Sequence, residues 1–126
     1  MKKIILITGL FLLVSVFHLQ AQSINNKNWK AYMAEPFNDT LTLHIQSDSS
    51  FVTLSNGEVL VRSVCKITGD VVTITDYSTG QYSCPDMTGK YKINLSGDSL
   101  TLTLLEDPCE GRNQALNGLK WIKASK

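Results

Sequence analysis

The sequence predicts an all-β protein: an eight-stranded antiparallel up-and-down β-barrel with a short helix before the last strand. Three observations indicate this fold class. Apolar and polar residues alternate in short runs, as in 40–46, where Leu41, Leu43 and Ile45 share one face. Turn-forming residues separate most of these runs, which makes consecutive strands adjacent and antiparallel. Each run has one apolar face, and closing the sheet buries all of these faces and removes the exposed edges.

The residue pattern in the first half of the domain predicts five strands. Their expected ranges are 29–35, 40–46, 50–55, 58–67 and 71–76. The pair Asn56-Gly57 favours a tight hairpin turn, because both residues tolerate a positive φ angle. We expect Phe51 to be buried in the third strand. The fourth strand is expected to have an apolar face made of Val59, Val61, Ser63, Cys65 and Ile67.

The second half begins with a longer polar loop at 77–88 and continues with strands at 89–95 and 99–105. The turn Ser96-Gly97-Asp98 between them is a strong hairpin signal. Asp107 is expected to cap a helix whose first position is Pro108. The helix should cover 109–116 and end at Asn117-Gly118, and the last strand should cover 119–124.

Two architectures accommodate eight short strands. A β-sandwich would require long Greek-key crossings between its sheets, and the short connections of this sequence leave few of them. We therefore predict the barrel. The interior of an eight-stranded barrel is either just filled by side chains or wide enough for one small ligand.

The three cysteines test this topology. In an up-and-down barrel the connections alternate between the two ends, which places Cys84 and Cys109 at the same end. Cys65 lies beside a turn at the opposite end. The barrel therefore predicts a Cys84–Cys109 disulfide and a free Cys65. In the chain-entropy model, closing this loop stabilises the fold by about 3.5 kcal/mol.

Residues 1–21 have the layout of a secretory signal peptide. Lys2 and Lys3 precede an apolar run, and cleavage is expected after Ala21. The run is shorter than the roughly 20 residues needed to cross a bilayer, which argues against an uncleaved anchor. We thus expect a domain at 22–126 that is periplasmic or extracellular, with no membrane span after cleavage. Export also permits disulfides.

Composition excludes several function classes. Lys2 and Lys3 leave with the signal peptide, so 12 basic residues become 10 against 11 acidic residues, a formal charge of −1. There is no basic run, and we expect no nucleic-acid binding. No nucleotide-binding motif or closely spaced set of metal ligands is present, so neither a cofactor nor a metal is expected.

Part of the chain resembles a known family. The segments that carry the resemblance lie between Cys65 and Trp121: Gly89-Lys90-Tyr91, Gly97-Asp98-Ser99-Leu100-Thr101-Leu102, Asp107-Pro108-Cys109-Glu110-Gly111-Arg112 and Gly118-Leu119-Lys120-Trp121. They look like those of small secreted bacterial lipocalin-like (calycin-type) domains. The resemblance implies an exported eight-stranded barrel and names no ligand.

No residue pattern predicts catalysis. His44, the only histidine after residue 21, falls on the polar face of its strand and should face solvent. Cys65 is expected to be a buried thiol rather than a nucleophile. Trp29 and Arg112 are assigned to a barrel end. For Arg112, stacking on a tryptophan or capping the helix is favoured over contact with an anionic ligand.

The leading hypothesis is a non-enzymatic, monomeric barrel that binds a small apolar or amphipathic molecule. The alternative is a protein-interaction module, such as a protease inhibitor, which acts through the loops at the disulfide end. The candidate interior residues are Leu41, Leu43, Ile45, Phe51, Tyr91, Ile93, Leu100, Leu102, Leu104 and Trp121.

Overall fold

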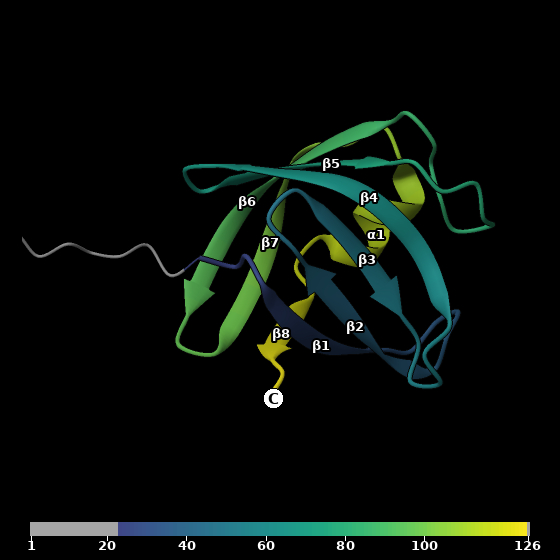
Figure 1. Cartoon of the computed structure of the whole chain (residues 1–126), viewed down its shortest axis with the longest axis horizontal. Helices are drawn as coiled ribbons and strands as arrows, with labels where there is room; N and C mark the ends of the chain where they lie inside the picture. Colours follow the sequence, from purple (N-terminus) through teal and green to yellow (C-terminus); the bar gives the residue numbers. More distant parts are fainter. Residues whose placement is uncertain (1–22, 126) are drawn as a thin grey trace, which may run out of the picture.

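The computed structural model describes residues 23–125, so the expected signal peptide at 1–21 lies outside the described residues. Eight antiparallel strands pair in sequence order, and β1 pairs with β8 to close the barrel (Figure 1). The strands are β1 (Lys27–Met33), β2 (Asp39–Ile45), β3 (Ser49–Thr53), β4 (Val59–Thr68), β5 (Val71–Asp76), β6 (Thr88–Ser96), β7 (Ser99–Glu106) and β8 (Lys120–Lys123). The predicted fold class is confirmed.

Helix α1 (Glu110–Leu116) lies between β7 and β8, as expected. It begins later than the sequence suggested: Cys109, rather than Asp107, occupies the N-cap position and makes no side-chain cap hydrogen bond. The Asp107 carboxylate instead accepts a hydrogen bond from the Cys109 N–H at 2.9 Å. The helix ends at Asn117, and Gly118 has a φ of 78°, a left-handed conformation that glycine adopts without steric cost.

A β-bulge between β3 and β4 changes which residues point inward. Val52 pairs with Val61 and Thr53 pairs with Val59, so Leu60 is the extra residue on β4. The prediction that Val59 belongs to the apolar face of β4 is therefore wrong. Val59 is exposed, while Leu60 packs against the core. Farther along β4, Ser63 and Cys65 are buried as expected.

One end of the barrel is filled by its own side chains. We call it the packed end, and it carries the β2–β3, β4–β5 and β6–β7 turns. Ile24, before β1, is buried there, together with Ile45, Cys65, Val72 and Leu100. The opposite end, which we call the hollow end, carries the β1–β2, β3–β4 and β5–β6 connections and α1.

Candidate functional site

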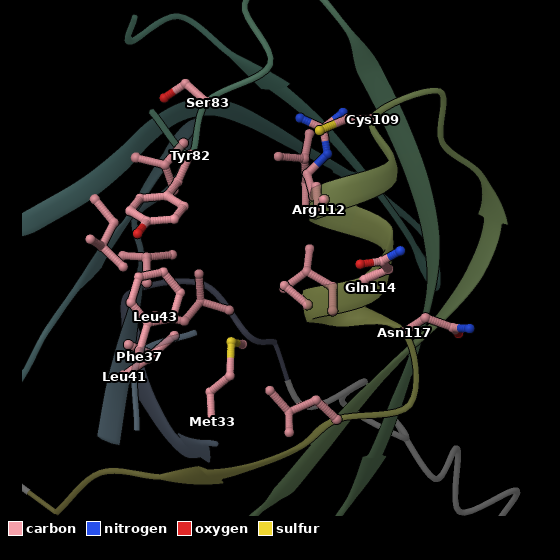
Figure 2. A pocket seen from close by; sticks show the side chains of 18 of the residues that line it. Met33, Phe37, Leu41, Leu43, Tyr82, Ser83, Cys109, Arg112, Gln114 and Asn117 are labelled. Atoms are coloured by element: carbon pink, nitrogen blue, oxygen red, sulfur yellow. The ribbon is translucent and has the colours of Figure 1, made fainter. Parts of the chain in front are cut away.

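The hollow end contains a cavity of about 720 Å³. Helix α1 forms one wall, and the opposite wall comes from β2–β5 and from the connections that follow β1 and β5. Figure 2 shows Arg112 and Gln114 on the helix side of the space and Phe37, Leu41, Leu43 and Tyr82 on the opposite side. The apolar lining residues include Met33, Ala34, Pro36, Phe37, Leu41, Leu43, Val52, Leu60, Val61, Ile74, Tyr82, Ala115, Leu116, Leu119 and Trp121.

Only part of the predicted interior lines this cavity. Leu41, Leu43 and Trp121 do so. The other inward-facing members of that set pack within the barrel and are not among the cavity-lining residues. They are Ile45, Tyr91, Ile93, Leu100, Leu102 and Leu104. Sequence periodicity thus identified the inner face, but it did not separate packed residues from cavity-lining ones.

Phe51 was assigned to the interior, and that assignment is wrong. It pairs with His44 on β2 and Arg62 on β4, and directly paired residues of antiparallel strands share a face. Its ring stacks on His44 with centroids 4.2 Å apart, and the Arg62 guanidinium lies 5.3 Å from the ring centroid. Ser50 and Val52 line the cavity, so Phe51 points outward between them.

Arg112 is the centre of a buried ion network at the hollow end. Its Nε and Nη2 donate to the two oxygens of Asp107 at 2.7 and 2.8 Å. Nη2 also donates to the Met87 carbonyl at 2.9 Å, and the Tyr91 hydroxyl donates to Asp107. The roles favoured for Arg112, stacking on a tryptophan or capping the helix, are not among its contacts within residues 23–125. Its partners are the carboxylates of Asp76 and Asp107 and the carbonyl of Met87, because the fold brings the ends of β5 and β7 to the start of α1.

Asp76, the last residue of β5, joins this network from the other side. Arg112 Nη1 lies 3.0 Å from its Oδ1, and both side chains are less than a tenth exposed. Ser63 Oγ donates to Oδ1 at 2.7 Å, and the Cys84 N–H donates to Oδ2 at 2.8 Å. Asp76 therefore positions the later part of the β5–β6 connection, at Cys84, against α1.

The pKa values in this network reflect a balance between burial and hydrogen bonding. Burial acts to raise the pKa of Asp107, but hydrogen bonds from Arg112, Tyr91 and Cys109 outweigh it and lower the pKa below its ordinary value. Burial acts to lower the pKa of Arg112, yet the two carboxylates raise it overall. Burial and the adjacent Asp107 raise the pKa of Tyr91. At neutral pH the arginine is charged and the tyrosine is a neutral donor.

The predicted Cys84–Cys109 disulfide is present, with the two Cα atoms 5.9 Å apart. It links the β5–β6 connection to the start of α1, and both cysteines line the cavity. The Asp76 carboxylate lies within 4.8 Å of both sulfurs, a spacing found in metal sites. The sulfurs are bonded to each other and Asp76 is paired with Arg112, so the oxidised cluster serves as a structural link.

Cys65 and His44 lie away from the cavity lining. Cys65 is free and buried, as predicted, and burial raises the pKa of its thiol to about 11. His44 is on the outer face but is partly buried, because it packs against Phe51. Its ring nitrogens lie 3.1 Å from Asn28 Oδ1 and 2.9 Å from Thr53 Oγ1, and burial lowers its pKa.

Trp29 and Trp121 are both almost fully buried, and both belong to the core. Trp121 also lines the cavity, whereas Trp29, which was assigned to a barrel end, does not. Within residues 23–125, neither indole N–H has a hydrogen-bond partner.

Sequence reasoning missed Asp76 and Asp107 as partners of Arg112. Both are separated from their partners by turns or loops, and an aspartate at a strand end is more often a turn residue. The glycine at position 89, within a strand, was the one sequence feature that could have indicated a close contact in this region. A side chain there would collide with the Asp107 carboxylate, so this glycine permits the close approach of β6 to the network.

None of the protein-family models, curated proteins or solved structures compared with this chain matches it. The disulfide is compatible with an exported protein. Across residues 23–125, no helix has the length and apolar character that crossing a membrane requires.

Proposed function

We propose that this protein is an exported, non-enzymatic, lipocalin-like barrel that binds a small apolar or amphipathic molecule in the cavity at its hollow end. The observation that carries the proposal is the cavity itself. Its volume of about 720 Å³ falls within the roughly 300–1,000 Å³ of small-molecule sites. Its lining is largely apolar, with a few polar groups such as Ser63, Asp76 and Arg112 at one side. This combination suits a ligand with an apolar body and a small polar group.

The arrangement of reactive groups favours binding over catalysis. His44 packs on the outer face of β2, outside the cavity lining. The Cys65 thiol is buried, and its raised pKa disfavours the thiolate at neutral pH. Asp107 accepts hydrogen bonds from Tyr91, Cys109 and Arg112, which leaves its carboxylate engaged in structure rather than poised as a base. The signal peptide expected from the sequence and the Cys84–Cys109 disulfide both support a periplasmic or extracellular location.

The test is binding of N-phenyl-1-naphthylamine, an uncharged apolar fluorophore, to the oxidised domain. Val61→Trp places a bulky ring on the cavity lining, while Val64→Trp makes the same change on the exposed outer face of β4. We expect saturable binding to the unaltered domain, unchanged binding to the Val64 variant, and at least about tenfold weaker binding to the Val61 variant. Thermal unfolding verifies that both variants are folded. Absence of saturable binding, or equal binding by both variants, contradicts the proposal.

A second candidate function is suggested by exposed tyrosine and methionine side chains at the hollow end. Tyr32, Tyr77, Tyr82 and Met87 are each between 43% and 57% exposed, and three of them belong to the connection between β5 and β6. Tyrosine and methionine are enriched in protein interfaces. This surface suits a protein-interaction module, such as a protease inhibitor.

Inhibition of a panel of purified secreted proteases distinguishes this alternative. If the loop is the contact surface, Tyr77→Ser and Met87→Ser, which alter exposed side chains outside the cavity lining, should relieve the inhibition, whereas Val61→Trp should leave it intact. If Val61→Trp abolishes the inhibition as strongly as the loop variants do, the barrel interior, and not the loop alone, would be required for inhibition.

A further inference from the structure

The charged side chains that line the cavity differ in whether a ligand can reach them. Within residues 23–125 they are Glu35, Asp76 and Arg112. Asp76 and Arg112 are 2% and 9% exposed and pair with each other, and Arg112 also pairs with Asp107. Glu35, in the connection between β1 and β2, is exposed and belongs to neither ion pair. A charged group on a ligand would therefore meet the Glu35 carboxylate.

Aromatic side chains lie on the same part of the cavity lining. Tyr32 and Phe37 flank Glu35 in the chain, and both line the cavity. Tyr82, from the β5–β6 connection, also lines it, and its ring centroid is 4.7 Å from that of Phe37. Figure 2 shows these two rings together on the wall opposite α1. Tyr32 and Tyr82 are 57% and 43% exposed, so their rings are accessible. The face of an aromatic ring attracts a cation.

The connections at the hollow end carry charge of one sign. The segments 34–38, 54–58, 77–87 and 107–119 contain one basic residue, the buried Arg112. Their acidic residues are Glu35, Glu58, Asp86, Asp107 and Glu110. By contrast, every lysine between residues 27 and 123 lies in a strand. The hollow end therefore has excess negative charge, which attracts a cation and repels an anion.

We propose that the cavity takes a cationic amphiphile, whose ammonium group is held by the Glu35 carboxylate and by the rings of Tyr32 and Tyr82. Its apolar chain lies against the leucine and valine side chains of β2–β4. Because Glu35 is exposed, the ammonium group stays in contact with water while the chain is buried, which avoids the cost of burying an unpaired charge. This inference rests on the proposed function, because it specifies the ligand of the same cavity.

The experiment is displacement of N-phenyl-1-naphthylamine by three ligands with the same alkyl chain: decyltrimethylammonium, decan-1-ol and decanoate. Each is kept below the concentration at which it forms micelles. We expect the ammonium to compete most strongly and decanoate least, with a difference of at least about tenfold between the two ions. Higher salt should reduce this difference, because the charges at the rim are exposed to solvent.

Two pairs of variants test the assigned residues. Glu35→Gln should weaken the ammonium relative to the alcohol about threefold, whereas Glu58→Gln, at an exposed acid outside the cavity lining, should have less effect. Tyr82→Leu keeps an apolar side chain but removes the ring, and should weaken the ammonium relative to the alcohol roughly threefold. Tyr77→Leu is its control, because Tyr77 is exposed on the same connection but does not line the cavity. Thermal unfolding verifies that the variants are folded.

Several outcomes on the same protein would overturn the inference. The unaltered domain decides first: the inference is wrong if decanoate or the alcohol displaces the fluorophore as strongly as the ammonium does. It is also wrong if Glu35→Gln changes the competition by the ammonium no more than Glu58→Gln does. Failure of the fluorophore itself to bind would instead remove the proposed function, which separates the two failures.

Discussion

The two ends of the barrel use the same alternating strand pattern but reach different interiors. At the packed end, Leu100 and Val72 meet in a core that Ile24 covers. At the hollow end, α1 lies over part of the opening, and the walls stay apart around a cavity of about 720 Å³. The packed end relies on apolar contacts between neighbouring strands. The hollow end has fewer such contacts and is braced by a disulfide and a buried ion network.

The difference teaches how a small barrel can remain open. A cavity lining lacks partner atoms on one side and loses their dispersion contacts. The disulfide and the ion network at the rim of the cavity offset that loss without filling the cavity. Arg112 connects α1 to Asp76 at the end of β5 and to Asp107 just after β7, and the disulfide connects the N-cap residue of α1 to the β5–β6 connection. The bracing holds the helix at the rim and leaves the cavity beneath it.

Breaking the ion network should have the largest effect. Arg112→Ala leaves Asp76 and Asp107 buried without their cation, and removing one partner of a buried pair costs about 3–5 kcal/mol. Urea unfolding monitored by circular dichroism measures the change in the free energy of unfolding. The control is Arg62→Ala, the chain's other arginine, which lies over Phe51 on the exposed face and should cost less than about 1 kcal/mol. Equal losses in both variants would mean that the network does not brace the hollow end.

Removing the disulfide should have the next largest effect at the hollow end. The Cys84→Ala and Cys109→Ala double variant should lose about 3.5 kcal/mol, the chain-entropy value for a bridge that spans 25 residues. Native-state hydrogen exchange localises the change. Protection should fall in α1 and at 77–87 while the β6–β7 hairpin stays protected. An equal loss of protection at both ends of the barrel would contradict the claim that the disulfide stabilises mainly the hollow end.

The sequence was most informative where local chemistry decides the structure. Alternation and turn residues located all eight strands, and strand parity was sufficient to pair Cys84 with Cys109 and to leave Cys65 free. These features depend on neighbours in the chain, and a two-residue periodicity records them directly. The packed end is built largely from such features, so its composition follows closely from the sequence.

The hollow end was less predictable because it depends on contacts between distant segments. The bulge at Leu60 reverses the expected facing of Val59. In β3, Phe51 was expected to be buried, but pairing with β2 and β4 turns Phe51 outward and Val52 inward. Asp76 and Asp107 become partners of Arg112 only after the helix has docked. Alternation along one strand does not contain this information.

Matched leucine truncations should show the difference between the ends directly. Leu100→Ala, at a side chain that is 0% exposed, opens a new void in the packed core and should cost about 3–5 kcal/mol. Leu41→Ala enlarges a space that already exists, so only the transfer of the lost carbons counts, about 2 kcal/mol. Urea unfolding measures both values. A larger loss at Leu41 than at Leu100 would show that the cavity collapses in solution.

Acid should weaken the hollow end through Asp107. The folded-state pKa of this carboxyl lies below its unfolded value, so its contribution is complete above the unfolded pKa of about 4 and is lost as the pH falls through the folded value. Asp107→Asn should therefore be less stable near neutral pH, and its free energy of unfolding should decline less steeply in acid. Urea unfolding at a series of pH values measures both effects.

Asp39→Asn is the control. Hydrogen bonds from Ser55 also lower the pKa of Asp39, but its exposed position makes the expected change in slope smaller. Suppose instead that the Asp39 variant reduces the acid-induced fall in the free energy of unfolding as much as the Asp107 variant does. Surface hydrogen bonding would then account for the pH dependence, and the buried network would not.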